Sequence, residues 1–185
     1  MTDDELKLAL REHAYLEGDF LLRSGKRSRY YLDKYRFETR PDLLAVLGER
    51  IAAVVADVDP EATRLAAPEL GAVVLAAATS LASGRPFVIV RGAPKDYGTR
   101  NRLEGAYEPG ERVCLLEDVV TSGGALLEAV SAVRDAGLTV ETAICVVDRE
   151  EGGVEALARE SVELRPIFRA RDVQNAGKTA AKPHG

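Results

Sequence analysis

The chain has 185 residues, of which 46% are hydrophobic and 30% charged, and its formal net charge at pH 7 is −5. This length and composition fit a single domain with one buried core and exclude a wholly disordered chain. The acidic balance argues against a dedicated nucleic-acid binder and a basic membrane-surface protein, so neither kind of partner is expected.

The cysteines and histidines are few and badly placed for metal binding or disulfide bonds. Cys114 and Cys145 lie in apolar runs without a C-x-x-C spacing, and the two histidines, His13 and His184, are far apart. This pattern disfavours a disulfide framework and a zinc site, and we assign no metal ligand. No apolar run reaches the ~18 residues that cross a bilayer, and residues 1–8 contain three acidic side chains, so we expect a cytoplasmic protein.

The charge is distributed unevenly along the chain. Residues 23–40 contain seven basic and two acidic side chains, a local net charge of +5 within a chain of net −5. A solvated basic hairpin is one interpretation of this segment. A site for an anionic ligand is the other.

The first third of the chain predicts two helices separated by short strands. A helix is expected over 2–16, with Thr2 as N-cap and Glu5 three residues later in a capping-box pattern. Short strands are expected at 20–22 and 30–32, and Pro41 begins a second helix at a position where its missing N–H costs little.

The remaining chain alternates between strand and helix patterns. Strands are expected at 64–67, 87–91, 112–116, 140–147 and 162–167; helices are expected at 70–82, 124–136 and 154–159; residues 92–110 form a long polar stretch. Such alternation predicts an α/β fold with a mostly parallel sheet flanked by helices. Ligands of such sheets bind at the carboxyl ends of the strands.

The segment from Val113 to Ala125 carries the strongest chemical signal. An apolar strand runs into Glu117 and Asp118, and a loop of Thr, Ser and two glycines then leads into a helix. Glycines and a helix N-terminus offer N–H groups to a phosphate, and carboxylates accept hydrogen bonds from sugar hydroxyls. Together they describe a site for a ribose 5-phosphate.

An ordinary strand-turn-helix connection, with a serine cap and surface carboxylates, is the alternative. A P-loop ATPase and a dinucleotide-binding site are both disfavoured, because G-x-x-x-x-G-K-[ST] and G-x-G-x-x-G are absent.

The E-D-V-V-T-S-G-G sequence at 117–124 resembles the PRPP-binding signature of type I phosphoribosyltransferases. Three further segments resemble the orotate phosphoribosyltransferases within that family: G-D-F-L-L-R-S-G with S-R-Y-Y at 18–31, V-R with K-D-Y-G-T and E-G at 90–105, and V-D-R-E-E-G-G at 147–153. The four segments occur in the family's order and span residues 16–170.

The resemblance implies a type I phosphoribosyltransferase-like parallel sheet with a small N-terminal hood. It implies one domain over 1–177, with a hood at about 1–40, a core at about 41–170 and a frayed tail at 178–185. The implied reaction transfers the phosphoribosyl group of PRPP to orotate, giving orotidine 5′-monophosphate and pyrophosphate in pyrimidine biosynthesis. Mg²⁺ held mainly through PRPP is the implied cofactor, and a homodimer is the implied assembly.

The resemblance also assigns roles to individual residues. Arg91 and Lys95, on or beside a mobile loop, would meet the departing pyrophosphate, and Asp118 would also stabilise positive charge on the ribose ring. The residues expected to bind PRPP are Arg91, Lys95, Tyr97, Glu117, Asp118, Val119, Val120, Thr121, Ser122, Gly123, Gly124 and Ala125. The residues expected to bind orotate are Arg23, Lys26, Tyr30, Tyr31, Thr121 and Arg149. For the two tyrosines, packing within the hairpin is an alternative.

The chain departs from the family pattern at four places. Gly92 stands where a lysine is usual, the 68–71 segment lacks the lysine found in many bacterial members, and Arg23 and Tyr97 replace a lysine and a histidine common there. A phosphoribosyltransferase for another nucleobase and a non-enzymatic PRPP-binding regulator of the same fold are the alternative functions.

Overall fold

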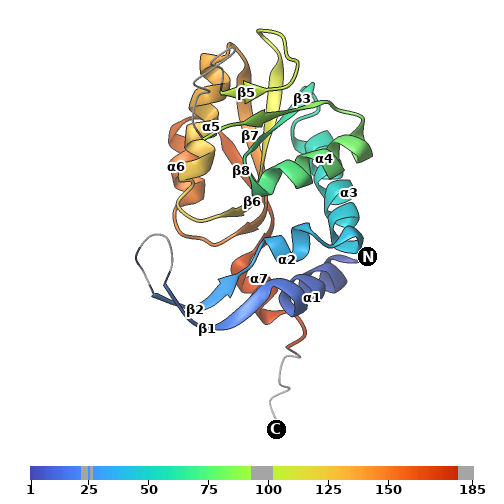
Figure 1. Ribbon diagram of the computed structural model, residues 1–185, viewed down its shortest axis with the longest axis vertical. Coiled ribbons are helices and arrows are strands. Elements are labelled where there is room, and N and C mark those ends of the chain that lie inside the picture. The colour runs from blue at the N-terminus through green and yellow to red at the C-terminus, as the bar shows by residue number, and fades with distance from the viewer. Residues whose placement is uncertain (22–24, 26, 93–101, 179–185) are drawn as a thin grey trace.

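The computed structural model describes residues 1–21, 25, 27–92 and 102–178 (Figure 1). This part of the chain contains a six-stranded sheet in the order β5-β4-β3-β6-β7-β8 and a separate two-stranded sheet, β1-β2. The strands of the larger sheet are β3 (Arg64–Pro68), β4 (Phe87–Val90), β5 (Leu103–Glu104), β6 (Arg112–Val120), β7 (Thr139–Asp148) and β8 (Glu163–Arg169). Within the described part of this larger sheet only β4 and β5 pair antiparallel, so the predicted α/β fold with a mostly parallel sheet is confirmed.

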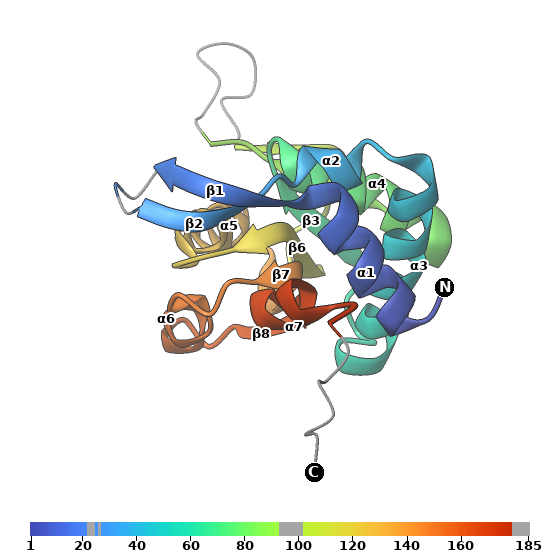
Figure 2. The ribbon, with the colours of Figure 1, turned by 90° about the horizontal axis from the view of Figure 1, so that it is seen from below.

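Helices cover both faces of this sheet. The helices α3 (Pro41–Val58) and α4 (Gly71–Ser83) lie on one face, and α5 (Gly124–Asp135) and α6 (Gly153–Arg159) lie on the other (Figures 1 and 2). Neighbouring residues along a strand therefore enter different cores: Leu65 and Ala67 pack with α3 and α4, and Ala66 packs with α5. A parallel sheet buried on both faces explains the nearly continuous apolar runs of its strands.

The N-terminal segment forms a small unit beside the large sheet. It contains α1 (Asp3–Ala14), the antiparallel strands β1 (Tyr15–Leu21) and β2 (Arg27–Leu32), and the short α2 (Tyr35–Glu38). The last helix, α7 (Ala170–Asn175), returns to pack beside α1 (Figure 2). Buried Leu6, Leu10 and Val173 belong to the same core as α3 and α4, so this unit is packed onto the sheet domain.

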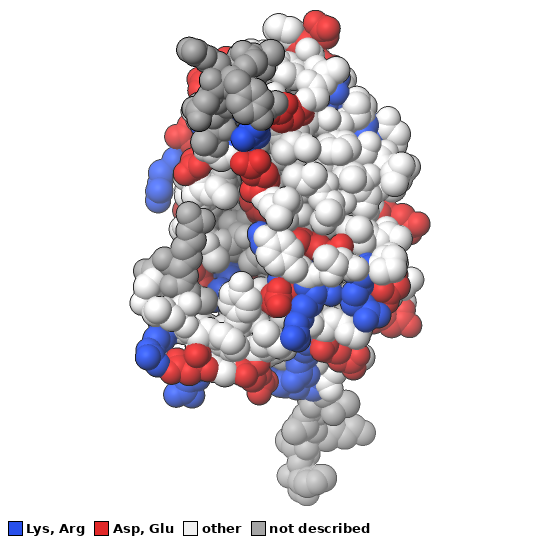
Figure 3. Space-filling model, in the orientation of Figure 1, with Lys and Arg blue, Asp and Glu red and all other residues white. Residues whose placement is uncertain are grey.

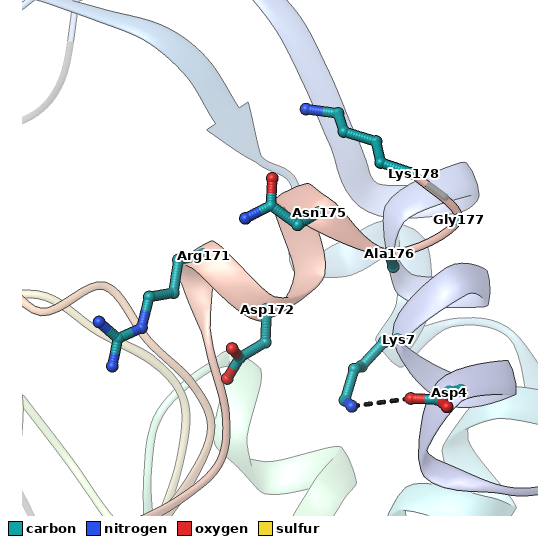
Figure 4. Close-up of a pocket in the computed structure, with 8 residues that line it drawn as sticks. All are labelled: Asp4, Lys7, Arg171, Asp172, Asn175, Ala176, Gly177 and Lys178. Carbon is teal, nitrogen blue, oxygen red and sulfur yellow. Dashed lines mark hydrogen bonds and ion pairs between the residues drawn. The ribbon is translucent and has the colours of Figure 1, made fainter. Parts of the chain in front are cut away.

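A surface pocket of mixed charge lies between α1 and α7 (Figure 4). Its lining includes Arg171, Asp172 and Lys178, and Lys7 contacts Asp4 at 3.0 Å across its edge. None of the residues that the sequence assigns to the reaction lines this pocket, so we give it no part in the chemistry.

Local signals located several element boundaries correctly. Thr2 and Glu5 form the predicted capping box: the Glu5 N–H donates to Thr2 Oγ1 at 3.3 Å and the Thr2 N–H donates to Glu5 Oε2 at 2.7 Å. Pro41 is at the first position of α3. The predicted end of α1 was wrong, because Tyr15 and Leu16 pair with β2 and begin a strand instead.

The strand predicted at 112–116 is longer than expected. Pairing with β7 continues from Glu117 to Val120, so Glu117 and Asp118 lie in the last part of β6 and not in a loop after it. Three short elements, α2, β5 and α7, carry no periodicity and were not predicted. Of the predicted tail at 178–185, only Lys178 is described. No helix in the described ranges is long and apolar enough to cross a membrane.

Gly48 is the point of closest approach between α3 and α4. A Cβ at this position would lie 2.8 Å from the carbonyl carbon of Ala78 and 2.8 Å from its Cβ. Backbone atoms cannot rotate away, so we expect Gly48→Ala to lower the free energy of unfolding by about 1–2 kcal/mol and the Tm by several degrees. Helix propensity alone would give the opposite sign, since Ala is favoured over Gly by about 1 kcal/mol. A rise in Tm by calorimetry would contradict this packing, and Ala56→Gly on the exposed face of α3 calibrates the propensity effect.

Candidate active site

The strand order places a change of direction between β3 and β6. From β3 the chain moves outward through β4 to β5, and it then returns to form β6 on the other side of β3. Open α/β sheets bind ligands in the crevice at such a point, beyond the carboxyl ends of the strands. The segments that follow β3 and end β6 meet there. Charged side chains of both signs surround the hollow between this edge and the hood (Figure 3).

The turn between β6 and α5 forms a small pocket. It is lined by Glu117, Val119, Val120, Thr121, Gly123, Gly124, Ala125 and Leu126. Gly123 is the N-cap of α5 with φ +83°, and no side chain caps this helix, so the first N–H groups of α5 remain available. The N-terminus of α6 approaches closely: a Cβ on Gly153 would lie 2.4 Å from Val120 Cγ1 and 2.9 Å from the Thr121 carbonyl oxygen. The turn is thus a backbone cradle that suits a phosphate.

Two adjacent carboxylates are fixed by backbone groups at this edge. Glu117 Oε1 accepts from the Asp118 N–H at 3.0 Å, and Asp118 Oδ1 accepts from the Val119 N–H at 2.6 Å. Both residues are buried. Burial and the charge of Asp118 raise the pKa of Glu117 to about 8.

Asp118 is also held by a residue from the hood. Lys34, immediately before α2, donates from Nζ to Asp118 Oδ2 at 2.7 Å, and the Asp118 side chain is only 3% exposed. Gly71, the first residue of α4, leaves the space for this pair, because a Cβ there would lie 2.0 Å from Asp118 Oδ2. Sequence reasoning did not identify three residues of this site. They are Lys34, Gly71 and Glu38, whose Oε1 would lie 3.1 Å from a Cβ on Gly71. Lys34 was counted only in the charge of 23–40, and no local pattern joins it to a residue 84 positions later.

Arg149 faces the hood from the end of β7. Its guanidinium carbon lies 4.9 Å from the ring centroid of Tyr30, and the Tyr30 ring stacks on Tyr15 with centroids 5.2 Å apart. The Arg149 side chain is 7% exposed and contacts Glu151 at 3.0 Å. Its Nε has no hydrogen-bond partner among the described residues, so this guanidinium keeps donor capacity for an anionic ligand.

The other described candidates are placed less centrally. Tyr31 points to the opposite face of β2, where its ring lies 5.6 Å from that of Phe20 and is 41% exposed as a residue. The structure therefore brings Tyr30, but not Tyr31, to Arg149. Arg91 follows β4, and its Nη1 lies 3.4 Å from Glu104 Oε1. Arg23, Lys26, Lys95 and Tyr97 lie outside the described residues.

The basic segment at 23–40 is less open than its charge suggested. Arg27 contacts Asp19, Arg36 contacts Asp33 at 3.4 Å, and Arg40 contacts Asp42 at 2.8 Å. Together with Lys34, four of the five basic side chains that the structure describes in this segment have carboxylate partners. Three of these partners, Asp19, Asp42 and Asp118, lie outside the segment, so the fold neutralises part of the predicted anion-attracting surface.

Known proteins with closely similar sequences are orotate phosphoribosyltransferases. No protein-family model matches the chain. The orotate phosphoribosyltransferase of Methanocella arvoryzae is 46% identical over 173 residues, covering 92% of this chain and 97% of that protein. The Halobacterium salinarum orotate phosphoribosyltransferase is 47% identical over 175 residues, covering 95% and 98%. The chain belongs to the orotate phosphoribosyltransferase family.

A solved structure supports the same assignment at the level of the fold. The orotate phosphoribosyltransferase of Mycobacterium tuberculosis H37Rv in complex with PRPP has a TM-score of 0.78 and 30% identity, covering 93% of this chain and 98% of that one. The resemblance noted in the four sequence segments is thereby confirmed. As an orotate phosphoribosyltransferase, the protein is a pentosyltransferase, a glycosyltransferase of pyrimidine biosynthesis.

Proposed function

We propose that this chain transfers the phosphoribosyl group of PRPP to orotate through the site between β3, β6 and the hood. One observation carries the proposal: the Glu117–Asp118 pair lies in the last part of β6, just before the uncapped β6–α5 turn, and Arg149 follows the neighbouring strand β7. Glu117 and Asp118 hold the two ribose hydroxyls, and the N–H groups of residues 121–125 hold the 5′-phosphate. Arg149 pairs with the orotate carboxylate, and Tyr30 supports the guanidinium.

The reaction breaks the bond between ribose C1 and a diphosphate oxygen, and the electron pair leaves with pyrophosphate. A ring nitrogen of orotate then forms the new bond to C1 and loses its proton, which passes to the departing pyrophosphate or to water. Positive charge develops on the ribose ring, so placed negative charge speeds the reaction without a covalent nucleophile. Asp118 supplies that charge. Arg91 and Lys95 are proposed to meet the pyrophosphate, with Tyr97 beside them, and Arg23 and Lys26 are proposed to face orotate.

Mg²⁺ fits this site as an ion that arrives with PRPP. Asp118 Oδ2 is already paired with Lys34, and the raised pKa of Glu117 disfavours its charged form, so neither carboxylate is free to be a strong resident ligand. The diphosphate oxygens would hold the ion with water, and its charge would offset that of the leaving group.

Turnover of a panel of bases tests this function. Purified protein with PRPP and Mg²⁺ should consume orotate, followed by its absorbance, and should leave adenine, hypoxanthine and uracil unchanged. Turnover of another base without orotate would establish the phosphoribosyltransferase alternative. PRPP binding without turnover of any base would establish the regulator alternative.

We further propose that the protein acts as a homodimer through the outer surface of α3 and α4. Large apolar side chains are exposed there, including Leu70, Val74 and Leu81 at 71%, 38% and 89% exposure. Pro41, Leu44 and Ala78 line a shallow groove between the helices, and among the described residues Glu49 is its one charged lining residue. Figure 3 shows a broad area without charge over α4. Such a surface fits a second copy of the same chain, which carries the same apolar patch.

Leu81→Glu should convert the dimer to a monomer, because a charge at the centre of this patch loses its hydration when the interface forms. Sedimentation equilibrium measures the change. Val154→Glu, an apolar-to-charged change on α6 across the sheet, should leave the dimer intact. A wild-type protein that stays monomeric at tens of micromolar would contradict the assembly.

A cytoplasmic location and a single phosphoribosyltransferase domain over 1–177 complete this proposal. Both substrates are charged and do not cross a bilayer unaided, which supports a location where PRPP is made.

A further inference from the structure

Lys34 lies where three parts of the fold converge on one carboxylate. It precedes α2 in the hood, Asp118 lies near the end of β6, and Gly71 begins α4. The Lys34 Nζ–Asp118 Oδ2 distance is 2.7 Å, and a Cβ on Gly71 would lie 2.8 Å from Lys34 Nζ and 3.1 Å from Glu38 Oε1. The side chains of Lys34, Glu38 and Asp118 therefore share one small space. This space exists because residue 71 is a glycine and has no side chain.

Both oxygens of Asp118 are directed by donors of the protein. Oδ1 accepts from the Val119 N–H and Oδ2 accepts from Lys34. The backbone donor comes from the neighbouring residue and fixes Oδ1 whenever β6 forms. Oδ2 depends on Lys34, which reaches Asp118 from a different element and leaves 31% of its own side chain exposed. The position of Asp118 Oδ2 thus depends on a contact from the N-terminal unit.

Lys34 also sets the charge of this space. Three carboxyl groups, Glu38, Glu117 and Asp118, surround it, and burial with the charge of Asp118 raises the pKa of Glu38 to about 8. A protonated Glu38 can donate to Asp118 from behind. Burial opposes the charged form of Lys34, but the neighbouring carboxyl groups, Asp118 foremost and then Glu117 and Glu38, together outweigh burial and raise the pKa of Lys34. The lysine therefore stays positive among these carboxyl groups.

We propose that Lys34 is a positioning residue for the transfer reaction, which holds the Asp118 carboxylate in the orientation that the ribose of PRPP requires. This role rests on the proposed function of Asp118. Without the ammonium, Asp118 Oδ2 would lose the donor that fixes its position. The hood would then affect PRPP use through this contact, in addition to its proposed contacts with orotate.

Lys34→Met tests the role, because it removes the charge and keeps most of the side-chain length. We expect kcat/KM for PRPP to fall about 10- to 100-fold, since hydrogen bonds to charged groups contribute about 1.5–3 kcal/mol, and the KM for orotate to change less than about threefold. Lys34→Arg should restore part of the loss. Arg36→Met, on the exposed side of α2 and paired with Asp33, is the matched control and should keep the wild-type kcat/KM for PRPP.

A double-mutant cycle with Asp118→Asn separates positioning from direct substrate contact. If Lys34 acts through Asp118, Lys34→Met should change kcat/KM for PRPP less than about twofold in the Asp118→Asn background. A full additional loss there would mean that Lys34 meets PRPP itself and would overturn the proposal. Wild-type-like kinetics for Lys34→Met would overturn it too. If Lys34→Met fails to fold in thermal melts, Lys34→Gln takes its place in the cycle.

A failure of the positioning role of Lys34 can be distinguished from a failure of the proposed transfer to orotate. Wild-type turnover of orotate is measured first. If orotate is not turned over, calorimetric binding of PRPP to the same variants gives the same comparison, and equal PRPP affinity of wild type and Lys34→Met would refute the positioning role.

Discussion

Replacing Asp118 with Asn should lower kcat/KM for PRPP by about 10²- to 10³-fold while leaving the protein folded. The substitution keeps the size of the side chain and the backbone contact to Val119, but it removes the negative charge proposed to face the ribose ring. It also leaves Lys34 without its ionised partner. Steady-state kinetics with varied PRPP at saturating orotate measure the effect.

Asp59→Asn is the matched control for this experiment. Asp59 is also a buried carboxylate in an ion pair, with Arg112 Nε at 2.7 Å, but it lies at the amino end of the sheet, beside the start of β6. We expect the control to lower the Tm and to leave kcat and both KM values near wild type. Normal activity of Asp118→Asn would remove Asp118 from the sugar site. An equal kinetic loss in both variants would indicate a general effect of burying an amide.

Replacing Arg149 with Met should raise the KM for orotate by about 10- to 100-fold and change the KM for PRPP less than about threefold. A charge-assisted, two-point contact to a carboxylate contributes about 1.5–3 kcal/mol, and each 1.4 kcal/mol is tenfold. Arg149→Lys should restore little, because an ammonium neither forms the fork nor stacks as a plane on Tyr30.

Arg134→Met controls for the loss of an arginine that pairs with a glutamate. Arg134 contacts Glu160 at 3.2 Å on the outer surface of α5 and α6, away from the hood. The Arg134→Met variant should have the wild-type KM for orotate and the wild-type KM for PRPP. Equal increases in the two KM values of Arg149→Met would show that the residue supports the fold of the site and does not recognise the base.

The sequence predicted the features whose signals are local. The capping box at Thr2 and Glu5, Pro41 at the start of α3 and the turn after β6 each depend on neighbouring residues, and each was found where expected. The α/β architecture followed from the alternation of apolar runs, because strands of a buried parallel sheet read as continuous hydrophobic segments.

Features created by packing were missed or misplaced. β6 continues through Glu117 and Asp118 only because β7 pairs with it there, and α2 is a single turn without periodicity. The contact between Lys34 and Asp118 joins two segments 84 residues apart, and its space depends on a glycine from a third. A motif can identify the carboxylate, but it does not contain the cation that holds it. The count of basic residues at 23–40 overestimated the free positive charge for the same reason, because partners such as Asp42 and Asp118 lie outside that segment.

A crystal structure of the protein with PRPP and Mg²⁺ tests the central claim most directly. We predict that the 5′-phosphate lies within hydrogen-bond distance of the N–H groups of residues 121–125 and that the ribose hydroxyls contact Glu117 and Asp118. PRPP bound elsewhere, or bound in this crevice with its ribose away from both carboxylates, would contradict the account.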